Sequence, residues 1–88
     1  MDRLTCCVPD CHRTIGHERA VNLWGYIPRE WMCARHWSRL TKAERRVWSR
    51  LRRQARRYGV NDIWRERESR LWAALRRRAS DRPPPILA

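Results

Sequence analysis

Three cysteines and a histidine, spaced as C-x4-C and C-x2-H, constrain this chain more than any other feature. A turn that contains Pro and Asp can bring two thiols together, and residues three apart lie on one face of a helix. Zn²⁺ prefers such thiolate and imidazole ligands in a closed tetrahedral site. The spacing therefore predicts a structural zinc site with Cys11, Cys33 and His36. Either Cys6 or Cys7 can supply the remaining ligand, and His12 and His17 are also within reach along the sequence.

Length and cysteine content favour a metal over disulfides. A chain of 88 residues buries little apolar surface, so domains of this size often depend on a metal or on disulfides. The N-terminus has no apolar segment typical of a secretory signal, and no apolar run is long enough to span a membrane. We therefore expect a cytoplasmic protein without membrane contact. Its thiols should stay reduced and able to bind metal.

A second motif accompanies these cysteines. The residues Cys6-x-Val8-Pro9-x-Cys11-x-Arg13, followed by Trp31-x-Cys33-x-x-His36-Trp37, resemble small Cys3His zinc-finger proteins encoded by phages and prophages. The resemblance covers residues 6–40 and implies that Cys6 is the first ligand, with Asp10 at a position where the family usually has Gly. It also implies a treble-clef-like arrangement of knuckle, hairpin and helix, and the host cytoplasm as the location.

The pattern of the chain predicts a small zinc-stabilised α+β fold in three parts. Residues 1–40 form a zinc-finger head with a short β-hairpin at about 14–32 and a short helix from 33 to about 40. Residues 41–79 form a helical hairpin, because a Thr41–Glu44 capping box starts one helix, Gly59 ends it, and a second begins at Asn61 or Asp62. Residues 80–88 form an extended, Pro-rich tail.

Apolar residues at helical spacing predict how the two long helices pack. The first stripe contains Val47, Trp48, Leu51, Ala55 and Tyr58, and the second contains Trp64, Leu71, Trp72, Leu75 and Ala79. These stripes also allow two copies of the chain to pair. Trp31 and Trp37 should cover the zinc, whereas Trp24 has no evident packing role and is free to contact a partner.

Basic residues are concentrated in the first long helix. The chain carries a net charge of +12, and residues 41–60 hold eight basic residues against the single acid Glu44. Glu66 and Glu68 on the next helix are too few to neutralise them. Such crowding of like charges is relieved by a polyanion, and guanidinium groups suit phosphate contact. The predicted nucleic-acid-binding residues are Lys42, Arg45, Arg46, Arg50, Arg53 and Arg57.

Two functions follow from these features. The first is a zinc-finger protein that binds nucleic acid, with DNA favoured over RNA, in which structural zinc positions the basic helix on the phosphate backbone. The alternative is a phage-type zinc protein that binds and modulates a host complex such as a polymerase or a defence system, because Arg and Trp are frequent in protein–protein hot spots. Zinc with four protein ligands leaves no position for water, and no Asp-His pair suits a nuclease, so no enzyme activity is expected.

Overall fold

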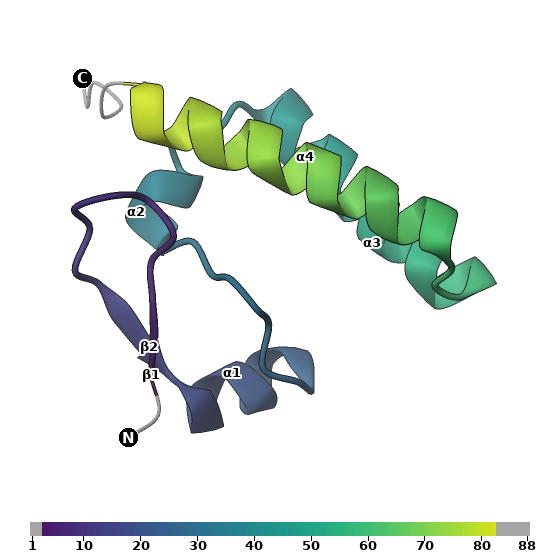
Figure 1. The fold of residues 1–88 in the computed structure, drawn as a ribbon, viewed down its shortest axis with the longest axis horizontal. Coiled ribbons are helices and arrows are strands. Elements are labelled where there is room, and N and C mark those ends of the chain that lie inside the picture. The colour runs from purple at the N-terminus through teal and green to yellow at the C-terminus, as the bar shows by residue number, and fades with distance from the viewer. Residues whose placement is uncertain (1–2, 83–88) are drawn as a thin grey trace.

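The computed structural model describes residues 3–82, which form a two-stranded sheet and four helices (Figure 1). This is the small α+β fold that the sequence predicts. The head is the lower part of the view in Figure 1, and the two long helices lie side by side above it. In chain order the elements are β1 (Arg3–Thr5), β2 (Thr14–Gly16), α1 (His17–Trp24), α2 (Ala34–Trp37), α3 (Lys42–Tyr58) and α4 (Asp62–Asp81).

Strands β1 and β2 form an antiparallel hairpin around the first two cysteines. Leu4 is paired with Ile15, and the backbone amide of Cys6 continues the ladder by donating to the carbonyl of Arg13 at 2.9 Å. The hairpin loop therefore carries the cysteine knuckle. A bridge between Cys6 and Trp31 fixes this loop to the segment that leads into α2.

The prediction of a β-hairpin within residues 14–32 is wrong. Only Thr14–Gly16 is a strand, and its partner lies upstream at Arg3–Thr5. Val21, Leu23 and Trp24 have strand propensity, yet they belong to helix α1, which ends at Gly25 in a left-handed conformation with φ +81°. Tertiary context overrides such propensities. The treble-clef assignment is not confirmed, because α1 lies where that assignment places a hairpin.

Side-chain caps fix where the two long helices begin. The Thr41 side chain accepts from the Glu44 amide at 3.1 Å, and the Glu44 carboxylate accepts from the Thr41 amide at 2.8 Å, which confirms the capping box. Asn61 caps α4 by accepting from the Trp64 amide. Helix α4 continues to Asp81, two residues beyond the predicted end near 79. Arg82 is extended because the next residue is proline; the predicted tail from 83 onward lies outside the described residues.

Replacing Thr41 with Ala should destabilise the protein by about 1 kcal/mol, because the Glu44 amide loses its side-chain acceptor. Chemical denaturation followed by circular dichroism at 222 nm measures the change. Thr41→Ser is the matched control, since serine retains the capping hydroxyl. Equal losses in both variants would show that the hydroxyl does not cap α3.

Glu44 also connects the two ends of the helical hairpin. Its carboxylate forms ion pairs with Arg78 at 3.1 Å and with Arg82. The hydrogen bond from Arg82, with a smaller contribution from the Thr41 amide, lowers the pKa of Glu44 from 4.5 to about 2. The start of α3 is thereby attached to the end of α4.

The stabilisation from Glu44 should depend on pH. The pKa of its carboxyl is lower in the folded chain, so the contribution is fully present above about pH 4.5 and is lost as the pH falls towards 2. The stability difference between the native protein and Glu44→Gln should narrow over that range. Urea titrations at stepped pH test this, and a constant difference would mean that the ionised carboxylate contributes nothing.

The head and the helical hairpin share one hydrophobic core. Leu75 and Ala79 of α4 are fully buried against Cys6, Cys33 and Leu40. The predicted apolar stripe of α4 is confirmed. Trp64, Leu75 and Ala79 are buried, and the partly buried Leu71 and Trp72 pack against the core. Along α3 Leu51 is buried, but Val47 and Tyr58 are exposed in the described part of the chain, so this end of the predicted stripe is not confirmed.

No helix in the part of the chain that the structure describes is both long and apolar enough to cross a membrane.

Candidate metal centre and basic helix face

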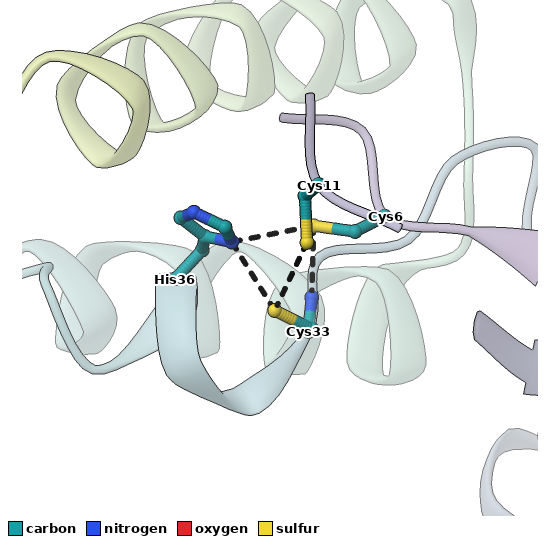
Figure 2. Close-up of side chains that lie close together, drawn as sticks. All are labelled: Cys6, Cys11, Cys33 and His36. Atoms are coloured by element: carbon teal, nitrogen blue, oxygen red, sulfur yellow. Dashed lines mark hydrogen bonds between the residues drawn. The ribbon is translucent and has the colours of Figure 1, made fainter. Parts of the chain in front are cut away.

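Four side chains from separate parts of the head meet at one point (Figure 2). Cys6 and Cys11 come from the hairpin loop, Cys33 is the N-cap of α2, and His36 is in the only turn of that helix. Their ligand atoms all lie within 4.8 Å of one another, and no disulfide joins the cysteines. The structure therefore brings together the four residues predicted as metal ligands.

The separations within this cluster suit a tetrahedral metal ion. Ligand bonds of about 2.3 Å to sulfur and 2.0–2.1 Å to nitrogen imply tetrahedron edges of about 3.8 Å between sulfurs and 3.6 Å between sulfur and nitrogen. The observed edges are 3.9 Å from Cys11 Sγ to Cys33 Sγ and 3.6 Å from Cys6 Sγ to His36 Nδ1. Cys33 Sγ lies 3.2 Å from the same nitrogen. The residues present fit a metal ion.

The surroundings of the cluster favour ligand forms that bind metal. The Cys33 amide donates to Cys6 Sγ at 3.3 Å, which favours a thiolate, but burial outweighs this bond and raises the pKa of Cys6. A hydrogen bond from the Arg13 backbone lowers the pKa of Cys11. Burial, followed by the nearby charges of Arg39, Arg35 and Arg13, lowers the pKa of His36, so its imidazole is neutral at pH 7. The charge of Arg13 also favours the thiolate of Cys11.

Cys7 is not among the clustered ligands, although it adjoins Cys6. Its amide donates to the Trp31 carbonyl at 2.7 Å, and burial, with the charges of Cys6 and Glu30, raises the pKa of its thiol to about 12. Of the two adjacent thiols, only one lies with the other ligand atoms. That one is Cys6. His12 and His17, the other nearby candidates, also lie outside the cluster.

Tryptophans pack beside the cluster. Trp31 and Trp37 are partly buried against the core that contains Cys6 and Cys33, in agreement with their predicted position. Trp24 in α1 is 42% exposed, as expected for a residue without a packing role.

The basic residues predicted to bind nucleic acid lie along α3. Five of the six are exposed and Arg45 is half-buried. None of the six forms an ion pair with another described residue. The nearby acids have other partners, because Glu44 binds Arg78 and Arg82, and Glu68 binds Arg52 at 2.8 Å. We call the set Lys42, Arg45, Arg46, Arg50, Arg53 and Arg57 the basic face.

A further group of residues has no signal in the sequence that marks it as a site. Tyr26 and Glu30, from the segment between α1 and α2, contact α3 and α4 through Arg52, Trp72 and Arg76. One weak indication was available. Arg52 follows Trp48 by four residues and Arg76 follows Trp72 by four, so in a helix each arginine lies next to a tryptophan on the same face. Their partners are more than 25 residues away in the chain.

Asp10 adopts a backbone conformation that favours glycine. Its φ of +66° makes it the one non-glycine residue with positive φ among residues 3–82. Glycine adopts this conformation without the clash that a Cβ brings, whereas Asp tolerates it better than most residues do. The geometry explains why a knuckle of this shape accepts either glycine or Asp at this position.

Replacing Asp10 with Gly should therefore leave the protein as stable or stabilise it by up to about 1 kcal/mol, while Asp10→Val should destabilise it by more than 1 kcal/mol. Thermal unfolding of the metal-loaded proteins measures both changes. Asp10→Asn controls for the charge, since Asn tolerates the same conformation. If the Asp10→Val protein were as stable as the Asp10→Asn protein, the turn would not require a positive φ at this position.

Comparisons with protein-family models, with curated proteins and with solved structures found no match for this chain.

Proposed function

We propose that the protein binds a structural zinc ion and uses the basic face of α3 to bind the phosphate backbone of nucleic acid. Cys6, Cys11, Cys33 and His36 would hold the zinc, which fits three sulfurs and one nitrogen better than Mg²⁺ or Ca²⁺, both of which prefer oxygen ligands. All four positions belong to the protein, so the zinc serves the fold and leaves no site for a bound water.

Zinc would act on α3 through the shared core. The cluster packs against Leu75 and Ala79 of α4, and α4 is attached to the start of α3 through Glu44. The position of the basic face relative to the head is thus fixed at two points. Loss of the metal should loosen the head first and α3 only indirectly.

One observation carries the nucleic-acid proposal: the basic face has no internal counter-charge. The acids that form ion pairs in the described residues, Glu30, Glu44, Glu66 and Glu68, pair with Arg52, Arg70, Arg76, Arg78 and Arg82 and with no residue of the basic face. The six cations of the basic face are left for an external anion. Successive turns of a helix are about 5.4 Å apart, so Arg46, Arg50, Arg53 and Arg57 form a row that can follow a chain of phosphates.

The test is binding of the purified, zinc-loaded protein to duplex and single-stranded oligonucleotides at increasing salt. The logarithm of the affinity should fall linearly with the logarithm of the salt concentration. Absence of binding at low salt, or affinity that does not change with salt, would contradict the proposal. Metal analysis of the same sample should find zinc.

A second candidate function, the binding of a host protein, is favoured by an exposed apolar surface on and after α1. Val21, Leu23, Trp24, Tyr26 and Ile27 are each at least 42% exposed. Exposed apolar residues that cluster often mark interaction sites. A stoichiometric partner that survives nuclease treatment and is lost with Leu23→Arg would favour this function over the first.

A further inference from the structure

A groove lies between residues 26–30 and the seam of α3 and α4. Its volume is about 780 Å³, within the range of about 300–1,000 Å³ that is typical of small-molecule sites. It lies on the side of α4 that carries Trp64, Glu68 and Trp72. The metal cluster is not part of its lining.

Aromatic rings form much of this groove. Trp48 and Trp72 lie 5.2 Å apart between centroids and are only half-buried. Tyr26 is 45% exposed and Trp64 is 8% exposed. The groove therefore presents ring surface that the core does not use.

One flat group of the groove lining, the guanidinium of Arg52, already packs beside two rings. The guanidinium carbon of Arg52 lies 5.7 Å from the Tyr26 ring centroid and 5.6 Å from that of Trp64. Glu68 and the Tyr26 hydroxyl hold it there, at 2.8 and 2.7 Å. Flat groups are thus accommodated by the spacing of these side chains.

Charge in the groove is positive after internal pairing. Arg52 is neutralised by Glu68, and Arg76 by Glu30 at 2.8 Å. Arg29 and Arg65 also line the groove, are exposed, and form no ion pair with another described residue. A ligand that is both aromatic and anionic matches this combination of rings and cations.

We infer that the groove binds unpaired bases of a single-stranded nucleic acid, which stack on Tyr26, Trp48 and Trp72 while Arg29 and Arg65 contact the adjacent phosphates. Aromatic side chains combined with cations are the usual means of binding single strands without sequence preference. Bases in a duplex are already stacked and paired, so they cannot enter. The inference rests on the proposed function and adds the class of nucleic acid: single-stranded in preference to duplex.

The experiment compares two oligonucleotides that carry the same number of phosphates. The full, zinc-loaded protein is titrated with a thymidine oligomer of about 12 nucleotides and with an abasic oligomer of equal length. Fluorescence anisotropy measures affinity, and tryptophan fluorescence reports stacking. We expect the thymidine oligomer to bind at least about fivefold more tightly than the abasic one, with quenching of tryptophan fluorescence.

Variants of Tyr26 test whether the preference for the thymidine oligomer comes from the groove. Tyr26 is exposed and lies outside the helices, and Arg52, which donates to its hydroxyl, keeps its ion pair with Glu68, so substitution of Tyr26 should leave the fold intact. Tyr26→Leu should reduce the preference for thymidine over abasic oligomer, whereas Tyr26→Phe, which retains the ring, should keep it. Ile63→Ser, a change at an exposed apolar residue that does not line the groove, should have no effect on this preference.

Each other outcome is decisive. Equal binding of the two oligomers would overturn the groove inference and leave phosphate binding by the basic face intact. Binding of a duplex but of neither oligomer would also overturn the groove inference, whereas absence of binding to all three at low salt would contradict the proposed function itself. A preference for bases that Tyr26→Leu does not change would place base contact elsewhere. A dimer in sedimentation that Tyr26→Leu converts to monomer would show that a second copy of the chain occupies the groove.

Discussion

Replacing Cys33 with serine is expected to remove zinc from the protein and to unfold the head. Cys33 is 2% exposed, and its sulfur lies 3.9 Å from Cys11 Sγ and 3.2 Å from His36 Nδ1. Structural zinc contributes about 10–16 kcal/mol to small fingers, which is as large as the whole stability of a typical domain. Metal analysis should find one zinc ion in the native chain and almost none in the variant.

The matched control is Cys7→Ser. Cys7 is also a partly buried cysteine of the hairpin loop, but it is not among the clustered ligands. Its variant should retain zinc and the NMR signals of the head. A chelator should reproduce the effect of Cys33→Ser in the native chain. If Cys33→Ser kept its zinc while Cys7→Ser lost it, the ligand set proposed above would be wrong.

Reversing the charges of Arg46, Arg50, Arg53 and Arg57 to Glu should have the largest effect on nucleic-acid binding. These side chains are exposed and have no acidic partner among the described residues, so the change should not break an internal ion pair. If each contacts one phosphate, the slope of log affinity against log salt should fall by about 3. Binding should become undetectable at 200 mM salt, while zinc content and helicity stay unchanged.

A matched pair of double variants separates the basic face from total charge. The first double variant carries Arg50→Gln and Arg53→Gln in α3. The second carries Arg67→Gln and Arg77→Gln in α4. Each removes two exposed cations from a helix. Only the first pair should lower the salt slope, by about 1.5 to 2. Equal losses from both pairs would mean that net charge, and no particular surface of α3, drives binding.

Much of the helical architecture could be predicted because the signals are local. Thr41 and Glu44 are three residues apart, and the conformation of each is set within a single turn. Gly59 ends α3 with a φ of +83°, which favours glycine. Such contacts need no knowledge of the rest of the chain.

The predicted hairpin at 14–32 was wrong because strand pairing is not local. Thr14–Gly16 pairs with Arg3–Thr5, so the strand signal at Val21 to Trp24 had no partner within reach. Without one, these residues form α1 and leave Leu23 and Trp24 exposed. The groove was missed for the same reason, since Glu30 and Arg76 are 46 residues apart.

The Cys/His pattern with which the sequence begins determined the kind of metal site, because ligand type and short spacing are properties of the chain itself. It also determined where the long helices start, through caps that act within one turn. Only the tertiary structure decided between Cys6 and Cys7, since the direction of a thiol depends on the pairing of Cys6 with Trp31. It also decided which arginines remain unpaired, because ion pairs such as that of Glu44 with Arg82 form between helices that meet only when the chain has folded.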